Sequence, residues 1–315
     1  MRTSIKTVAC VGAGLIGQGW ATLFAANGYD VILQDLNEDR LENATAQVNL
    51  NLMFLENNGR LQKGQTAVAC KRIRTMLNLA DAVKHADYIQ ESVPDNYAAK
   101  KEVFKEMDTA AAADAIFASS SSGLMMTEIQ KEVTQPQRCV LTHPFLPVHL
   151  IPLVEIVGGE QTAPETVDIT VALMEKLGKT PVRLRKEVSG YIVNRLQAAI
   201  LREAIDMVAS GVANAEEIDR AFCTGMGMRD PFIGPCLRAY LAGDGIEGFV
   251  EDYAESYALR WKSMAAWNTI PATMKKPFVN SVNNMEVVRQ HSLENIKKWR
   301  DKLLLEVLKL DRSFS

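Results

Sequence analysis

The length, composition and charge of the chain exclude several classes of protein before any motif is considered. Its 315 residues suffice for one large or two ordinary domains, and 47% hydrophobic with 23% charged residues is typical of a globular protein. The formal net charge of −3 provides no basic surface for nucleic-acid phosphates, and no apolar run is long enough to span a membrane. We therefore expect neither a nucleic-acid partner nor a membrane span.

The five cysteines are scattered and odd in number, and their spacing fits neither a zinc site nor a disulfide framework. We expect a reducing compartment and no bound metal. A strand pattern begins within about five residues of the N-terminus, which leaves no room for a signal peptide. The predicted location is therefore the cytoplasm.

The first elements form a complete βαβ unit around a glycine-rich loop. The parts are a strand over 7–11, the loop Gly12-Ala13-Gly14-Leu15-Ile16-Gly17, a helix to about Asn27, and a second strand over 30–34 that ends at Asp35. This arrangement is the fingerprint of dinucleotide binding, which makes it more specific than a glycine pattern alone.

Each position of the loop has a physical role in that fingerprint. Gly12 permits the tight turn, Gly14 lets the backbone approach a pyrophosphate, and Gly17 lets the helix pack closely on the strand. The phosphates would meet the free N–H groups at the positive end of the helix, where Leu15 and Ile16 lie.

Asp35 indicates which dinucleotide is bound. A carboxylate at the end of the second strand accepts hydrogen bonds from both ribose hydroxyls of NAD and repels the 2′-phosphate of NADP. We therefore predict NAD as the cofactor. An unliganded glycine-rich turn is the alternative.

Strands and helices continue to alternate along the first half of the chain. We expect helices over 41–59, about 75–84 and 98–112, and strands within ADYIQESV, IFASSSS and RCVLTHPF. This alternation predicts an α/β fold, a Rossmann-type doubly wound and largely parallel sheet. Ligands bind beyond the carboxyl ends of such strands, where 91–96, 119–122 and His143 would meet.

The second half of the chain changes character after about Lys186. Its apolar residues recur at helical spacing, so we predict an NAD-binding domain over 1–187 and an all-α domain over 188–315 for substrate and dimerisation. Asn214 and Ser292 are expected to cap two helices, with Glu294 favouring the dipole of the second. That terminal helix is predicted to form either a homodimer interface or a solvated face.

An ionisable pair lies in the apolar stretch THPFLPVHLIPLVEIVGG. Oxidation of an alcohol needs a base, and imidazole suits this role because its unperturbed pKa of about 6.5 lies near neutral pH. His143 is predicted at a strand end on the ligand edge, and Glu155 could accept a hydrogen bond from its second nitrogen. A structural role is the alternative for His143, and it is the one we favour for His149.

Several long motifs resemble the 3-hydroxyacyl-CoA dehydrogenase superfamily over essentially the whole chain. They are GAGLIG, QESVPDNYAAKKEVF, SSSSGL, HPFLPVHLIPLVE and KEVSGYIVNRLQ. Within the superfamily, HPFLP with LIPLVE, KEVSGYIVNRLQ, GMGMRDPFIGP and the terminal WRD look most like the lambda-crystallin branch, whose activity is L-gulonate 3-dehydrogenase. L-carnitine dehydrogenases are the next most similar relatives.

This resemblance implies a role for individual residues. It makes His143 the catalytic base and Glu155 its dyad partner. By the same resemblance, the reacting oxygen of the substrate receives hydrogen bonds from Ser122 and Asn194. The nicotinamide half of the cofactor is contacted by Asp95 and Lys100. Without the resemblance, Ser122 and Asn194 would not be singled out.

Two further positions bear on the substrate. Leu146 stands where relatives usually carry asparagine, so cofactor geometry or substrate range is expected to differ. Arg229 is shared with the gulonate and carnitine branches, and its guanidinium could bind the C1 carboxylate of a free acid, which a thioester lacks. An internal salt bridge is the alternative for Arg229.

We therefore predict an enzyme, an NAD-dependent 3-hydroxy acid dehydrogenase acting on a CH–OH group. The expected substrate is a small free 3-hydroxy acid resembling L-gulonate, and the expected assembly is a homodimer. The alternatives are a 3-hydroxyacyl-CoA dehydrogenase, an L-carnitine dehydrogenase and, from a different class, a structural crystallin-like protein.

Overall fold

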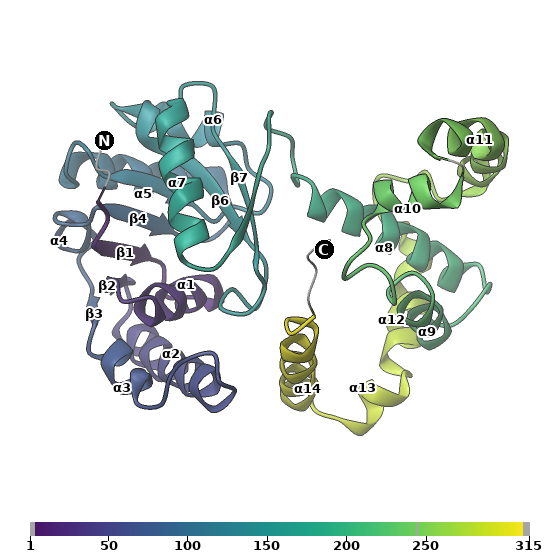
Figure 1. Ribbon diagram of the computed structural model, residues 1–315, viewed down its shortest axis with the longest axis horizontal. Coiled ribbons are helices and arrows are strands. Elements are labelled where there is room, and N and C mark those ends of the chain that lie inside the picture. Colours follow the sequence, from purple (N-terminus) through teal and green to yellow (C-terminus); the bar gives the residue numbers. More distant parts are fainter. Residues whose placement is uncertain (1–3, 244, 311–315) are drawn as a thin grey trace. The chain divides into compact units, whose positions relative to one another are not determined.

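The computed structural model describes residues 4–243 and 245–310 (Figure 1). The chain divides into two compact units, Met1–Asn194 and Arg195–Ser315. They are called the nucleotide unit and the helical unit below, and each is described by itself.

The nucleotide unit is built around one eight-stranded sheet. Its strands are β1 (Thr7–Val11), β2 (Asp30–Gln34), β3 (Ile73–Met76), β4 (Tyr88–Glu91), β5 (Ile116–Ser119), β6 (Cys139–Pro144), β7 (Leu153–Val157) and β8 (Thr180–Arg183). They lie in the order β3-β2-β1-β4-β5-β6-β7-β8. All neighbours are parallel except β6 and β7, which pair antiparallel. The prediction of a doubly wound, largely parallel sheet is confirmed.

Helices cover both faces of this sheet (Figure 1). The helices of the unit are α1 (Leu15–Ala26), α2 (Glu38–Asn57), α3 (Gln65–Cys70), α4 (Leu79–Val83), α5 (Tyr97–Ala110), α6 (Met126–Ile129) and α7 (Pro164–Lys176), with short 3₁₀ turns η1 (Gln130–Glu132) and η2 (Pro136–Arg138). Successive strand residues point to opposite faces, so Val8 and Cys10 join the core beneath α1, α2 and α7, while Ala9 and Val11 join the core beneath α4 and α5.

The structure corrects two of the predicted helices. Thr75 lies in β3 and not in a helix, because residues 73–76 pair with β2 and tertiary pairing decides such a short segment. Helix α2 begins at Glu38 and not at Leu41, since the side chain of Asn37 accepts a hydrogen bond from the Arg40 N–H and caps it there.

The antiparallel turn from β6 to β7 determines where the predicted dyad lies. Its register places His143 directly opposite Glu155 on the neighbouring strand. Side chains of directly opposed residues project from the same face of a sheet, so the two groups meet although twelve positions separate them in the chain.

The helical unit contains no strand among its described residues, as predicted. Its helices are α8 (Val193–Ala209, which begins in the nucleotide unit), α9 (Ala215–Thr224), α10 (Pro235–Ala242), α11 (Gly245–Ser263), α12 (Ala272–Asn283), α13 (Glu286–Gln290) and α14 (Leu293–Val307). Both predicted caps are confirmed: Asn214 forms a capping box with Glu217, and the Ser292 side chain accepts from the Asn295 N–H.

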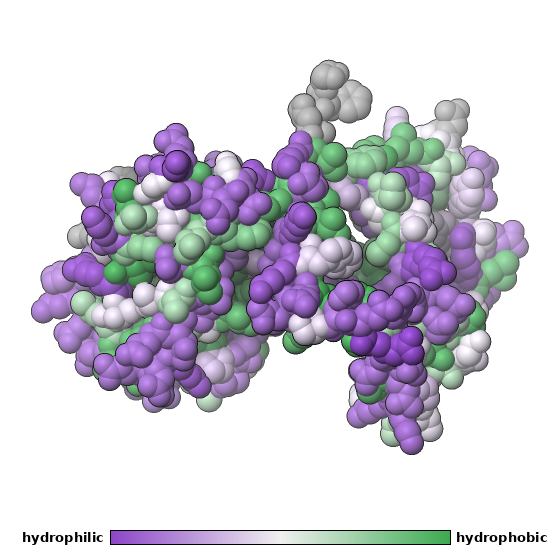
Figure 2. Space-filling model, turned by 90° about the horizontal axis from the view of Figure 1, so that it is seen from below, coloured by the Kyte–Doolittle hydropathy of each residue, from purple (hydrophilic) through white to green (hydrophobic). Residues whose placement is uncertain are grey.

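The helical unit exposes much apolar surface. Among its described hydrophobic residues only Ile205, Ala215 and Leu305 are fully buried. Large side chains such as Trp261 and Trp299 are exposed, and apolar residues reach the surface among polar ones in Figure 2. None of the helices that the structure describes is long and apolar enough to cross a membrane.

Candidate active site

The glycine-rich loop after β1 has the geometry that a dinucleotide requires. Gly12 has a φ of +94°, and a Cβ there would lie 2.8 Å from the Ser92 carbonyl oxygen. A Cβ on Gly17 would lie 1.8 Å from the Gly12 carbonyl oxygen, so only glycine permits this contact between helix and loop. A Cβ on Gly14 would meet nothing within 4 Å. Gly14 therefore faces open space that a pyrophosphate can approach.

The start of α1 offers donors for an anion. The helix has no side-chain cap and no acidic residue in its first turn. Its first intrahelical donor is the N–H of Gln18, which bonds to the Gly14 carbonyl, and the preceding N–H groups of Leu15 and Ile16 form no hydrogen bond with any described residue. Such free N–H groups and the positive end of the helix dipole favour bound phosphate.

Asp35 follows β2 and contacts the same loop. Its Oδ2 accepts a hydrogen bond of 2.9 Å from the Ala13 N–H, and its Oδ1 accepts a longer one of 3.3 Å from the Asn37 N–H. Arg40 lies 3.9 Å from Oδ1 and is largely exposed. The carboxylate is thus held beside the loop and keeps further acceptor capacity.

His143 and Glu155 form a buried hydrogen-bonded pair. Their exposed fractions are 4% and 1%, and 2.8 Å separates His143 Nδ1 from Glu155 Oε2. An ionised carboxylate only accepts, so Nδ1 donates and Nε2 is left to accept a proton. The second oxygen of Glu155 accepts from the N–H groups of Ile192 and Val193, at 2.9 and 3.0 Å. The same carboxylate therefore orients the imidazole and fixes the start of α8.

Two aromatic rings enclose the imidazole. The ring centroids of Phe145 and Tyr191 lie 4.6 and 5.2 Å from that of His143. Tyr191 is fully buried, has a φ of +48°, and donates its hydroxyl to the Leu124 carbonyl at 2.7 Å. Burial raises the pKa of this hydroxyl far above its usual range. Tyr191 therefore stays protonated and acts as a packing and hydrogen-bonding group.

Ser122 and Asn194, which lie far apart in the sequence, are brought together. The side-chain amide of Asn194 donates to the Ser122 carbonyl at 2.9 Å. The Ser122 hydroxyl donates to Asp95 Oδ2 at 2.7 Å, and its N–H donates to the same oxygen at 3.0 Å. Burial raises the pKa of Asp95, but the hydrogen bonds from Ser121 and Ser122 and the charge of Lys100 outweigh it and lower this pKa below its usual value.

Lys100 is buried in a way that sequence patterns did not indicate. It is 1% exposed, and its ammonium lies 2.7 Å from Glu91 Oε1 and 3.8 Å from Asp95 Oδ1. Glu91 is itself fully buried and also accepts from the Ser119 hydroxyl at 2.6 Å. The sequence predicts Glu91 at the ligand edge of the sheet but does not predict this ion pair. Glu91 lies at the end of a strand and Lys100 in a helix, so no periodic pattern of the sequence connects them.

The remaining predicted residues are found on exposed segments. Leu146 is half exposed on the loop between β6 and β7. Arg229 belongs to the helical unit and forms no ion pair with any residue in the described ranges. It lines a pocket of about 520 Å³ within that unit, together with Arg238, Phe249 and Tyr257.

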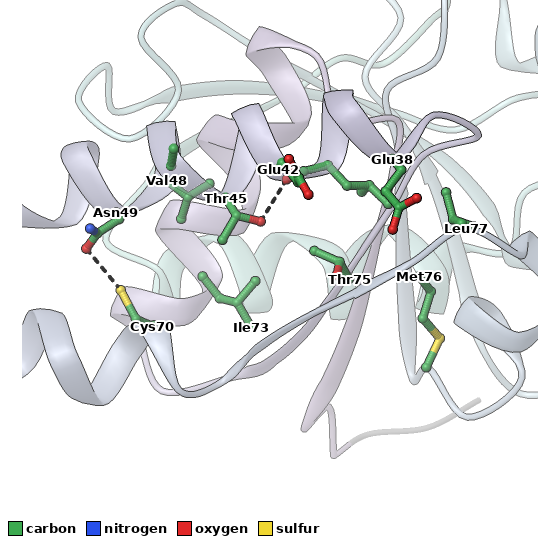
Figure 3. A pocket seen from close by; sticks show the side chains of 12 residues that line it. Glu38, Glu42, Thr45, Val48, Asn49, Cys70, Ile73, Thr75, Met76 and Leu77 are labelled. Carbon is green, nitrogen blue, oxygen red and sulfur yellow. Dashed lines mark hydrogen bonds between the residues drawn. The ribbon is translucent and has the colours of Figure 1, made fainter.

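A larger pocket lies between α2 and β3 (Figure 3). It has a volume of about 830 Å³, with Glu38 and Leu77 near one end and Asn49 and Cys70 near the other. The Cys70 thiol donates to the Asn49 side chain at 3.3 Å. None of the predicted catalytic residues lines this pocket, so its size does not make it the reaction site.

Comparison with protein families identifies the two halves of the chain. Residues 7–188 match the NAD-binding domain of 3-hydroxyacyl-CoA dehydrogenase, and residues 190–280 match its C-terminal domain. The chain belongs to this family. It is therefore an NAD-dependent oxidoreductase of a family that acts on 3-hydroxyl groups.

Curated relatives match almost the full length. The chain is 38% identical to an L-carnitine dehydrogenase of Burkholderia mallei over 97% of its own length and 94% of that protein's. It is 36% identical to the lambda-crystallin homolog of Homo sapiens over 96% and 95% of the two lengths. The predicted likeness to both branches is confirmed.

Solved structures support the same assignment. A 5-formyl-3-hydroxy-2-methylpyridine 4-carboxylic acid 5-dehydrogenase, described as an NAD⁺-dependent dismutase, superposes with a TM-score of 0.83 at 27% identity and covers 97% of this chain and 98% of its own. An (S)-3-hydroxybutyryl-CoA dehydrogenase of Ralstonia eutropha gives a TM-score of 0.67 at 30% identity, with coverages of 81% and 89%. No cluster of metal-ligating side chains occurs among the described residues.

The two glycines of the loop provide a test of the cofactor cradle. Gly14→Ala is expected to weaken NAD binding about 10-fold or more, the equivalent of 1.4 kcal/mol, without lowering Tm, because its Cβ fills only open space. Gly17→Ala should weaken NAD binding and also lower Tm, because its Cβ collides with the Gly12 carbonyl. Calorimetric titration with NAD and thermal unfolding measure both effects; unchanged affinity in Gly14→Ala would contradict the cradle.

Proposed function

We propose that the protein oxidises the 3-hydroxyl of a small free 3-hydroxy acid, resembling L-gulonate, to the 3-keto acid. His143 is the general base and Glu155 orients it. The observation that carries this proposal is the buried 2.8 Å hydrogen bond between His143 Nδ1 and Glu155 Oε2 at the ligand edge of the NAD-binding sheet. Its geometry leaves Nε2 available for a proton.

The proton and the hydride leave the substrate by separate routes. NAD, when bound, accepts the hydride from the carbon that carries the hydroxyl. His143 Nε2 takes the hydroxyl proton and becomes an imidazolium, whose charge the buried carboxylate of Glu155 stabilises. Because Glu155 also accepts from two backbone N–H groups, its position does not depend on the charge of His143.

Ser122 and Asn194 are proposed to hydrogen-bond the reacting oxygen. The Ser122 hydroxyl donates to Asp95, so a substrate oxygen that needs this donor must compete with the carboxylate. The Asn194 amide uses one N–H on the Ser122 carbonyl and keeps a second for the substrate. Substrate binding therefore exchanges one hydrogen bond of the protein for one to the reacting oxygen.

Asp95 and Lys100 are proposed to contact the nicotinamide half of the cofactor, and Asp35 the ribose at its other end. Lys100 is buried behind Asp95 and paired with Glu91, so we infer that its charge acts on the cofactor mainly by holding Asp95 in place. At the other end, Asp35 disfavours a 2′-phosphate by charge repulsion.

Arg229 is proposed to recognise the carboxylate of a free acid. Its guanidinium lines a pocket and forms no ion pair within the part of the chain that the structure describes, so its hydrogen-bonding capacity is available. A guanidinium binds a carboxylate through two parallel hydrogen bonds, whereas a thioester offers no such anion. This supports a free acid over an acyl-CoA.

L-carnitine is a second candidate substrate, favoured by the rings in the same pocket. Phe249 and Tyr257 line it together with Arg229, and aromatic faces attract quaternary ammonium groups. The guanidinium of Arg260 lies 4.1 Å from the Tyr257 ring, so one of these two rings faces a cation within the protein itself. A zwitterion that carries a carboxylate and an ammonium would satisfy both kinds of group.

A second copy of the chain is the proposed partner. A helical unit with few buried side chains leaves apolar surface that is costly to keep in water. Trp299 and Leu303, one turn apart on α14, are both exposed and offer a hydrophobic seam for a homodimer.

The role of His143 is tested by replacement. His143→Ala should lose about 100-fold or more in turnover, the lower end for general acid–base catalysis, because the proposed base is removed. It should still bind NADH, which fluorescence titration measures, since the glycine loop is untouched. Turnover near that of the wild type would remove His143 from the role.

A substrate panel tests the role of Arg229. NADH absorbance is followed with NAD and L-gulonate, L-carnitine or L-3-hydroxybutyrate, and in reverse with acetoacetyl-CoA and NADH. Arg229→Met should raise the KM of the preferred free acid about 10-fold to 100-fold, since hydrogen bonds to charged groups contribute about 1.5–3 kcal/mol. Arg220→Met, at an exposed arginine, is the control. Preference for acetoacetyl-CoA would refute the free-acid proposal.

The oligomeric state can be checked by sedimentation. The wild type should sediment with twice the monomer mass, and Trp299→Glu should shift it toward the monomer because a charge enters the seam. Lys297→Glu, on the opposite face of α14, should leave the dimer intact. A monomeric wild type would exclude the proposed partner.

A further inference from the structure

A buried lysine lies outside the proposed catalytic set. Lys179, between α7 and β8, is only 7% exposed. Its ammonium donates to the carbonyls of Val148 and Ile151, the latter at 2.6 Å. The indole ring of Trp20, from the cofactor-binding helix α1, lies 5.9 Å from the same nitrogen. Lys179 therefore contacts two segments that are distant from it in the sequence, the loop that contains Val148 and Ile151 and the helix α1.

The ammonium has no carboxylate partner in the part of the chain that the structure describes. None of the acidic side chains in the described ranges forms an ion pair with Lys179, and burial lowers its pKa to about 7. A buried cation without an acid is costly unless hydrogen bonds compensate for lost hydration. The groups that compensate here are two backbone carbonyls and an aromatic face.

Both carbonyls belong to the loop that joins the two dyad residues. Residues 145–152 connect β6, which carries His143, to β7, which carries Glu155. Within the loop the Pro147 carbonyl accepts from the Leu150 and Ile151 N–H groups, both at 2.9 Å. This makes a turn whose Val148 and Ile151 carbonyls accept from Lys179.

The loop also contacts the base and the cofactor helix. Its first residue, Phe145, packs against the His143 ring at 4.6 Å. Val148 packs so closely on α1 that a Cβ at Gly19 would lie 2.6 Å from the Val148 Cβ. A shift of this loop would therefore change the packing of His143 and of the helix that binds NAD.

We propose that Lys179 is a positioning residue of the dehydrogenase, whose buried ammonium fixes the loop 145–152 and thereby holds His143 for proton transfer. The inference rests on the proposed role of His143 as base. It adds that the base is held from two sides, by Glu155 at Nδ1 and by a lysine-anchored loop against its ring.

Replacement with methionine removes the anchor but keeps the length and apolar stem of the side chain. In Lys179→Met, kcat is expected to fall on the order of 10-fold to 100-fold, as it does when a catalytic group is misplaced. The solvent isotope effect on kcat should rise, because proton transfer becomes more rate-limiting. Lys176→Met is the matched control, since Lys176 is exposed and lies three residues before Lys179.

A second measurement follows the loop without catalysis. Hydrogen exchange of the Leu150 and Ile151 amides should accelerate at least about 10-fold in Lys179→Met, because the turn they close loses its anchor. Exchange in the strands β1 and β4 should be unchanged. The control Lys176→Met should match the wild type at every amide.

The charge of the buried lysine has its own signature in stability. Its folded pKa of about 7 lies below the ordinary value of 10.5, so the unfolded chain binds more protons between these pH values. The contribution of this group to the free energy of unfolding therefore increases as the pH rises from about 7 to 10.5, and it is constant below about pH 7. The difference in unfolding free energy between wild type and Lys179→Met should follow this course.

The outcomes separate this inference from the proposed function. A wild type inactive on every substrate would refute the proposed function, and loop exchange would still decide the role of Lys179. If the wild type is active and His143→Ala is inactive, but Lys179→Met has a normal kcat, only the inference about Lys179 is overturned. Unchanged loop exchange in Lys179→Met, or a fall in kcat with an unchanged isotope effect, would overturn it as well.

Discussion

The hydrogen bond between His143 and Glu155 is the constraint on which the rest of the candidate site depends. A buried carboxylate is stable only where donors replace its lost water, and Glu155 receives three: the imidazole and the N–H groups of Ile192 and Val193. The sheet must reverse direction between β6 and β7 to bring the pair together, and α8 must begin beside it. The Glu155 side chain thus links β6, its antiparallel neighbour β7 and the start of α8.

A second group of charges, of which Glu91 and Lys100 are buried and Asp95 is exposed, also supports the candidate site. Glu91, Lys100 and Asp95 lie on neighbouring segments at the carboxyl edge of the sheet, and the serine hydroxyls of the loop after β5 donate into this group. Because Asp95 accepts hydrogen bonds from Ser121 and Ser122 and lies 3.8 Å from the Lys100 ammonium, several interactions at once hold the loop that carries Ser122. The loop that carries Ser122 is therefore positioned by charged groups that are not proposed to touch the substrate.

The features that depend on residues close together in the sequence could be predicted from the sequence. The loop Gly12–Gly17, the strands around it and the caps Asn214 and Ser292 follow from backbone sterics and hydrogen bonding within a few residues, and all were predicted. Thr75 was assigned to a helix because pairing with β2, which no local pattern reports, decides its state. The Glu91–Lys100 ion pair, the +48° φ of Tyr191 and the contacts of Lys179 were missed for the same reason. The hydrogen bond between His143 and Glu155 could be expected because the two residues lie in one short apolar stretch, whereas Ser122 and Asn194 were singled out only through the family resemblance.

The helix α1 takes part both in the cofactor-binding loop and in the packing that positions the proposed base. The helix α1 presents its N-terminus to the glycine loop, while Gly19 and Trp20 on the same helix face the loop between His143 and Glu155 and the lysine that anchors it. Trp20 also donates its indole N–H to Ser120, which in turn lies 2.9 Å from Ser92, and the backbone of Ser92 packs against Gly12. Interiors packed this closely transmit small displacements and do not absorb them. A displacement at the glycine loop is therefore transmitted along α1 to the loop that packs on His143. This packing gives a physical route by which binding of the cofactor can change the position of the proposed base.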